Sequence, residues 1–162
     1  MKRFQQEDKG NGTEMFSNVS SVFLRLALGF SFLSAVADRF GIWGDFGQPH
    51  VAWGTFAKFE AYTGQLNWFL PKTVIPALAV ISTGAETVLA ILLILGWQTR
   101  LAALLSGFLL LSFALTMTAA LGIKAPLDLS VFTAAGGAFL LFGSTEFPFS
   151  VDSSRSRRER AS

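Results

Sequence analysis

The chain has 162 residues, of which 51% are hydrophobic and 15% charged, and its formal net charge is +2. The hydrophobic residues gather in four long blocks, each close to the length needed to cross a bilayer core of about 30 Å, which argues against a soluble domain. Cysteine is absent and His50 is the only histidine, which excludes disulfides, iron–sulfur ligation and a bis-histidine haem site within one chain. We therefore predict an all-α integral membrane four-helix bundle.

The N-terminal residues 1–17 are polar and mixed in charge, and we interpret them as a disordered or surface-lying cytoplasmic tail. The first predicted span follows, from Val19 to Ala37. Its end resembles a signal-peptidase site, but the charge of Arg25 and the long charged leader favour a retained span. The membrane domain is expected over residues 18–149.

The segment between the first two spans is too polar to cross the membrane but is rich in aromatic residues. From Val51 to Tyr62 an aromatic residue recurs every three positions, which indicates a short helix lying at the membrane interface and ended by Gly64. An ordinary aromatic loop is the alternative interpretation.

Three further spans are predicted, from Thr73 to Leu95, from Leu101 to Leu121 and from Leu129 to Phe142. Residues 150–162 form a basic cytoplasmic tail. With four spans both termini share one side. That side would carry eight basic residues and the other side four, which places the termini in the cytoplasm by the positive-inside rule. The eight are Lys2, Arg3, Lys9, Arg100, Arg155, Arg157, Arg158 and Arg160, and the four are Arg39, Lys58, Lys72 and Lys124.

Two charged residues lie within predicted spans, Arg25 in the first and Glu86 in the second. Charges in lipid are costly and usually paired. Counted from the cytoplasmic ends of their spans, they lie roughly 9 Å and 13 Å deep at about 1.5 Å per residue. We predict that they form a buried pair, which either fixes the packing of the helices or makes Glu86 a proton-linked or ligand-binding carboxylate.

A second polar cluster is expected toward the outer face, where it could frame the mouth of a cavity. Its members are Asp38, Arg39, Lys124 and Asp128, the last also a candidate N-cap of the fourth helix. No metal site is predicted, and no P-loop, dinucleotide fingerprint or nucleophile–base–acid set is present. We expect a chain that is not a catalyst on its own.

Short motifs give the chain a family resemblance. Arg25-Leu26-Ala27-Leu28-Gly29 with Phe32, then Glu86, then the turn from Gly96 to Arg100, resembles the DoxX family of small bacterial membrane proteins with four spans. The loop Ala37-Asp38-Arg39-Phe40-Gly41-Ile42-Trp43-Gly44 and the segments Val51-Ala52-Trp53-Gly54 and Lys124-Ala125-Pro126-Leu127-Asp128-Leu129-Ser130 resemble one DoxX-like branch. The glycine and lysine that typically end the family's first helix are replaced here by Val36 and Arg39.

The resemblance implies the bacterial inner membrane and a link to quinone-coupled oxidation or to an oxidative-stress complex. The first functional hypothesis is an accessory membrane subunit of such a complex, with quinone docked beside Glu86 and no cofactor held by the chain's own ligands. The second is a small carrier or binder of an apolar or weakly acidic solute, and the third is a structural anchor for a partner protein. The expected partners are membrane lipids, a soluble or membrane-bound oxidoreductase and further copies of the chain. Nucleic acid is not expected, because the basic residues lie mainly at the chain ends.

Overall fold

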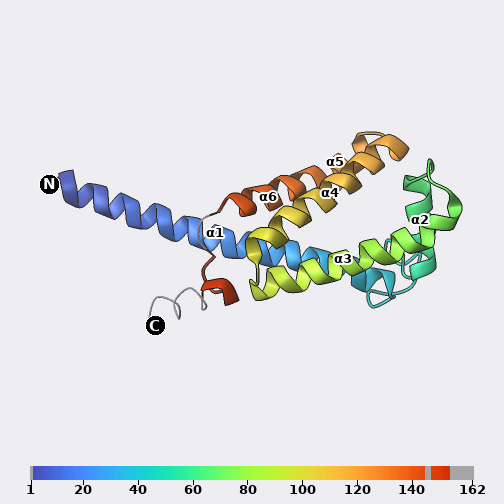
Figure 1. The fold of residues 1–162 in the computed structure, drawn as a ribbon, viewed down its shortest axis with the longest axis horizontal. Coiled ribbons are helices and arrows are strands. Elements are labelled where there is room, and N and C mark those ends of the chain that lie inside the picture. The colour runs from blue at the N-terminus through green and yellow to red at the C-terminus, as the bar shows by residue number, and fades with distance from the viewer. Residues whose placement is uncertain (1, 145–146, 154–162) are drawn as a thin grey trace.

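The computed structural model describes residues 2–144 and 147–153, and the helical architecture is the predicted one (Figure 1). The elements are α1 (Lys2–Arg39), α2 (Phe56–Leu66), a 3-10 turn η1 (Lys72–Val74), α3 (Ile75–Leu95), α4 (Thr99–Leu121), α5 (Lys124–Asp128) and α6 (Val131–Gly143). Three stretches of the described residues are long and apolar enough to cross a membrane: Met15–Arg39, Lys72–Leu95 and Thr99–Leu121. The chain is a helical membrane protein.

Local sequence explains where the helices begin and end. Pro76 occupies the first turn of α3, where its missing N–H costs nothing, and Gly96 ends this helix in the left-handed conformation (φ 67°). Thr55 caps α2 by accepting a hydrogen bond from the Lys58 N–H at 3.4 Å. The short helix between the first two spans is therefore present, although it covers Phe56–Leu66 and continues past Gly64.

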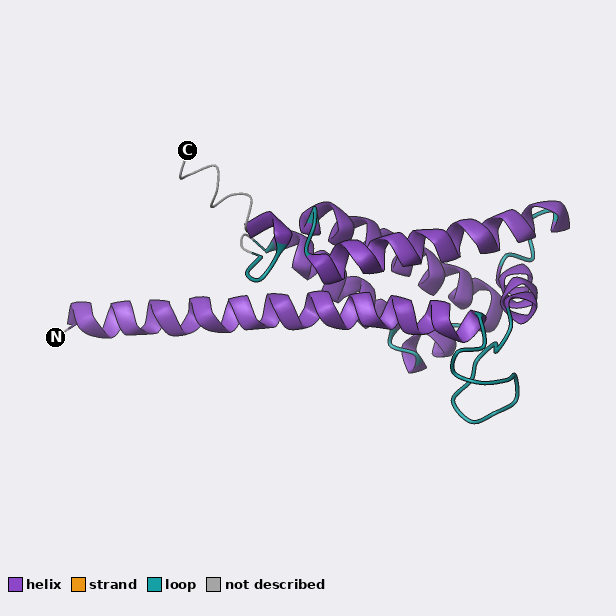
Figure 2. Ribbon diagram, turned by 90° about the horizontal axis from the view of Figure 1, so that it is seen from below, coloured by secondary structure: helices purple, strands orange, loops and turns teal. Residues whose placement is uncertain are grey.

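Two segments differ in extent from the sequence prediction. The segment expected to be a tail, residues 1–17, is helical from Lys2 onward, so that α1 extends far beyond the rest of the bundle (Figure 2). Gln, Glu, Lys and Met are good helix formers, and the polar residues simply continue the membrane helix. The fourth apolar helix begins at Val131, after a break at Ser130 (φ 55°), and at roughly 20 Å it is shorter than a bilayer core. Residues 154–162 of the predicted basic tail lie outside the described residues.

The helices pack as two antiparallel pairs, α1 with α3 and α4 with α6. Gly29 sets the register of the first pair, because a Cβ there would lie 2.7 Å from Ile94 Cγ1 and 3.2 Å from the Ala90 carbonyl oxygen. Figure 1 shows the two pairs close together near the α3–α4 turn and diverging toward α2. A packed core fills the converging end and includes Leu89, Leu93, Ala102, Ala138 and Leu141. The diverging end is where the polar residues described below are found.

Candidate functional site: a buried ion pair at a cavity wall

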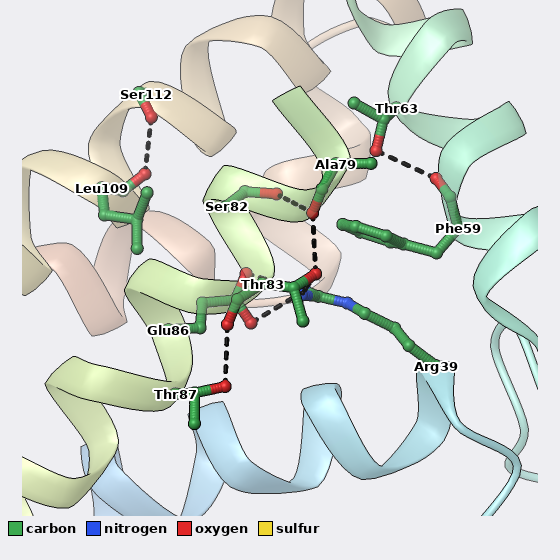
Figure 3. Close-up of polar contacts among 10 residues, drawn as sticks. All are labelled: Arg39, Phe59, Thr63, Ala79, Ser82, Thr83, Glu86, Thr87, Leu109 and Ser112. Carbon is green, nitrogen blue, oxygen red and sulfur yellow. Dashed lines mark hydrogen bonds and ion pairs between the residues drawn. The ribbon is translucent and has the colours of Figure 1, made fainter. Parts of the chain in front are cut away.

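Glu86 pairs with Arg39 inside the bundle (Figure 3). Arg39 Nη2 donates to both carboxylate oxygens of Glu86, at 2.7 and 2.8 Å, and Nη1 donates to Thr83 Oγ1 at 2.8 Å. Arg39 is 2% exposed and Glu86 is 1% exposed, so both members of the pair are buried. An ion pair in such a position is stable only when geometry and additional hydrogen bonds offset its desolvation, as they do here.

Hydroxyl groups on α3 are satisfied mostly within their own helix. Thr83 Oγ1 donates to the Ala79 carbonyl at 2.8 Å and Ser82 Oγ to the same carbonyl at 3.1 Å. Thr87 Oγ1 donates to the Thr83 carbonyl at 2.8 Å, and Ser112 on α4 bonds to Leu109 in the same way (Figure 3). Because the Thr83 hydroxyl proton is directed at Ala79, its lone pairs are available to accept from Arg39.

Aromatic rings enclose the Arg39 guanidinium. Its Cζ lies 3.7 Å from the centroid of the Phe59 ring, which belongs to α2, and 5.3 Å from the centroid of the Trp53 ring. A guanidinium this close to the face of an aromatic ring is attracted by the ring quadrupole, and the attraction is stronger without water. The rings therefore fix α2 and the preceding loop against the end of α1.

Asp38 holds that loop in place. Its buried carboxylate accepts the backbone N–H groups of Ala52, at 3.3 Å, and Trp53, at 2.8 Å. These two bonds tie residues 52 and 53 to the last turn of α1 and so position the Trp53 ring near Arg39. Sequence reasoning placed Asp38 and Arg39 at the outer end of the first span but gave neither residue this role.

A cavity of about 670 Å³ lies beside the ion pair, between the diverging helix pairs and under α2. Its walls are mostly apolar and include Phe32, Leu78, Leu110, Met117 and Val131. Ten polar side chains lie among them: Ser31, Arg39, Tyr62, Thr63, Asn67, Ser82, Glu86, Ser112, Thr116 and Ser130. No lining residue comes from the α3–α4 turn, where the packed core closes the bundle. The cavity is not fully enclosed, and it is confined to the α2 half of the molecule.

The predicted Arg25–Glu86 pair is wrong. Arg25 is buried, at 3% exposure, but its Nη2 donates to the Phe149 carbonyl at 2.8 Å. The register explains the difference, because Gly29 packs at Ala90 and Ile94, which sets Arg25 beside Gly96 and Arg39 beside Glu86. Arg25 is thus level with the α3–α4 turn, about ten residues or roughly 15 Å along the helix from Glu86. An arginine side chain cannot span that separation.

Arg25 belongs to a different group of polar contacts, at the α3–α4 turn. Residues 147–153 fold back over this turn. The Asp152 carboxylate accepts from the N–H groups of Gln98 (2.9 Å) and Thr99 (2.8 Å) and from the Thr99 hydroxyl (2.9 Å). The Asp152 N–H donates to the Gly96 carbonyl at 3.1 Å. Asp152 therefore caps the N-terminus of α4 from a distant part of the sequence. The sequence contained no local signal for this contact.

The predicted outer-face cluster separates into two parts. Asp38 and Arg39 are buried at the end of α1, where Arg39 lines the cavity, whereas Lys124 and Asp128 form an exposed i,i+4 pair within α5. No hydrogen bond or ion pair joins the two parts among the described residues. Asp128 does not cap α6, whose N-cap position is Ser130, because the α5 helix and its turn intervene.

No protein-family model, curated protein or solved structure matches this chain. Within residues 2–144 and 147–153, no group of three or more His, Cys, Asp or Glu side chains lies close enough to hold a metal ion. The site is therefore an ion pair, aromatic rings and scattered hydroxyl groups at the wall of an apolar cavity. Such a combination is suited to binding a lipophilic molecule that has one polar end.

Proposed function

We propose that this chain is a membrane-embedded binding protein, which holds a lipophilic small molecule in the cavity with the polar end of the molecule at Arg39 and Glu86. The observation that carries the proposal is the cavity of about 670 Å³, with its buried ion pair. Ligand sites in proteins have this size and combine apolar walls with a few placed polar groups. A bundle that served only as an anchor would need no such space.

The shape of the cavity favours a binder over a carrier that passes solute through the bundle. The cavity lining stops at Leu28 on α1 and Glu86 on α3, and beyond them Leu89, Leu93, Ala102 and Leu141 are packed together. A solute crossing the bundle would have to separate these side chains. Binding from the side where the helix pairs diverge requires no such rearrangement.

The wider role that we propose is that of an accessory subunit in a quinone-linked or oxidative-stress redox complex. Quinones are lipophiles with a polar ring, and the aromatic side chains of Phe32, Trp53, Phe59 and Phe113 at the cavity suit a ring of that kind. With one histidine and no cysteine in the sequence, electrons would be carried by the ligand and by a partner oxidoreductase. This part of the proposal rests on the resemblance of the motifs described in the sequence analysis to those of the DoxX family.

We also propose that the chain lies in the bacterial inner membrane with both termini in the cytoplasm. The eight-to-four distribution of basic residues supports this orientation. The cavity, α2 and the aromatic loop would then face the outer half of the membrane. The cluster of Arg25 and Asp152 would lie at the cytoplasmic surface.

Purification from the native membrane, followed by solvent extraction and mass spectrometry, tests the proposed binding. Ala134→Trp introduces a large side chain at the cavity wall, and Leu140→Trp introduces the same side chain on the lipid-facing side of the same helix, where Leu140 is 72% exposed. We expect a lipophile that co-purifies with the unmodified protein and with Leu140→Trp but is depleted from Ala134→Trp. Identical extracts from all three proteins would contradict the proposal.

A further inference from the structure

The donors of Arg39 are not all used. Nη2 donates to both oxygens of Glu86 and Nη1 to Thr83 Oγ1, but the Nε–H is buried and has no acceptor among the described residues. Buried polar groups in folded proteins nearly always have a hydrogen-bond partner, so an unpaired one at a cavity wall indicates an acceptor that the chain does not supply. Arg39 is part of the lining of the cavity in which the ligand is proposed to bind.

The charges at the cavity cancel. Among its lining residues only Arg39 and Glu86 carry charge, and they neutralise each other at 2.7 Å. Tyr62 also lines the cavity, and burial raises the pKa of its phenol above the ordinary value. An anionic or cationic headgroup would therefore bring an uncompensated charge into an apolar space, which is strongly disfavoured.

The carboxylate of Glu86 is fully occupied by its hydrogen bonds with Arg39. Both of its oxygens accept from Nη2, and the residue is 1% exposed. A ligand carboxylate that displaced Glu86 from Nη2 would strand the Glu86 carboxylate in the bundle, and one that accepted from the Nε–H would leave a net negative charge in the cavity. A neutral acceptor oxygen can instead receive the Nε–H while the ion pair stays intact.

We propose that the cavity selects a neutral lipophile whose polar end is a hydrogen-bond acceptor, such as a carbonyl oxygen, and that Arg39 Nε–H donates to it. The inference rests on the proposed binding function and narrows it, because it excludes the weakly acidic solutes that the sequence left open. Charged lipophiles of the same length are rejected by the balanced pair of Arg39 and Glu86.

The experiment is a displacement series on the protein in lipid nanodiscs at neutral pH. A photoreactive long-chain methyl ketone is crosslinked to the protein, and the labelled residues are mapped by peptide mass spectrometry. Unlabelled competitors share one chain length and differ only at the end: a methyl ketone, an alkane, a fatty acid and an alkylamine. We expect labelling of cavity residues and displacement by the ketone at a concentration about tenfold or more below those of the other three competitors.

Two kinds of failure are distinguishable. If the probe does not label cavity residues, the proposed binding function is wrong and the inference fails with it. If the probe labels the cavity but the acid or the amine competes as well as the ketone, the binding function stands and the proposed selectivity is overturned.

A variant locates the origin of the selectivity. The double substitution Arg39→Met and Glu86→Leu removes both charges together and leaves neither stranded. In this variant we expect the ketone and the alkane to displace the probe at similar concentrations, while the concentration of alkane required stays as it is in the unmodified protein. The matched control is Thr87→Ala, which removes a hydroxyl that bonds within α3 and lies outside the cavity lining, and in which the ketone should still displace the probe at a lower concentration than the alkane. Persistence of that advantage in the double variant would show that Arg39 is not the donor.

Discussion

Arg39, in the last turn of α1, and Glu86, in the middle of α3, form a buried ion pair that joins residues 47 positions apart in the sequence. The pair links the two helices at the cavity wall, and Phe59 of α2 stacks on its guanidinium. This one contact therefore contributes to the packing of α1 on α3, to the position of α2 and to the polarity of the cavity wall.

The first prediction concerns the coupling within this pair. Arg39→Met or Glu86→Gln alone should destabilise the protein by about 3–5 kcal/mol, because each leaves one polar partner buried without its counterpart. Glu86→Gln should cost more, since a stranded carboxylate can take up a proton whereas arginine cannot lose one. The double variant should recover part of the loss. Thermal unfolding in detergent measures all three proteins.

A second double-mutant cycle, with Arg25→Met in place of Arg39→Met, serves as the matched control. Arg25 is equally buried but bonds to the Phe149 carbonyl, so the effects of Arg25→Met and Glu86→Gln should be additive within about 0.5 kcal/mol. Additivity in the Arg39 cycle, or strong coupling in the Arg25 cycle, would show that the helix register is not the one described.

The second prediction concerns the loop that carries Trp53. Asp38→Asn leaves one acceptor oxygen for two backbone N–H groups and should cost about 1–3 kcal/mol. Limited proteolysis should then cut within residues 40–55 more rapidly than in the unmodified protein. Asp45→Asn changes an exposed aspartate in the same loop and should leave the cleavage rate unchanged. Equal cleavage rates for Asp38→Asn and Asp45→Asn would show that Asp38 does not hold this loop in place.

The third prediction concerns the α3–α4 turn. Gly96 has a φ of 67°, and a Cβ there would lie 2.4 Å from both Arg25 Nη1 and Ser150 Cβ. Gly96→Ala should therefore destabilise the protein by more than about 2 kcal/mol. Gly84→Ala introduces the same methyl group within α3, where nothing lies within 4 Å, and should be neutral or slightly stabilising. Similar melting temperatures for the two variants would contradict the packing at this turn.

The fourth prediction compares two aspartates. Asp152→Ala removes the acceptor for two backbone N–H groups and the Thr99 hydroxyl, and should cost about 1–2 kcal/mol, as for the loss of a helix N-cap. Asp128→Ala breaks an exposed pair with Lys124 and should change stability by less than about 1 kcal/mol. Chemical denaturation measures the loss of stability in each variant. A larger loss for Asp128→Ala than for Asp152→Ala would contradict the prediction.

The fifth prediction concerns orientation. Reporter fusions after Ser154 and near Gln48 should report the cytoplasm and the exterior respectively, because most basic residues lie toward the chain ends. An exterior signal from the C-terminal fusion would reverse the proposed orientation. The cavity would then face the cytoplasmic half of the membrane.

The helices could be predicted because runs of apolar residues, turn glycines and Pro76 are local signals. The partner of Glu86 could not be predicted from depth, because depths were counted separately from the estimated end of each span and the register depends on where Gly29 packs. The sequence did contain one indication of the true partner. Arg39 lies on the same helical face as Arg25 and Gly29, so either arginine could have faced Glu86.

The remaining contacts of the site join distant parts of the chain. Asp38 reaches the backbone of Ala52 and Trp53, and Asp152 reaches that of Gln98 and Thr99. Backbone N–H groups are present at almost every position, so the sequence does not distinguish those that a carboxylate will meet. The cavity arises from the divergence of two helix pairs, which depends on packing along their whole length (Figure 1).

The cavity beside Arg39 and Glu86 is proposed to hold a lipophilic molecule. A structure of the protein purified from its native membrane into nanodiscs, at a resolution that shows side chains, would reveal this molecule. We expect an elongated density, not belonging to the chain, between the α1–α3 and α4–α6 pairs, with one end in contact with Arg39. Side chains from the two pairs packed together across this space, with no room for a ligand, would contradict it.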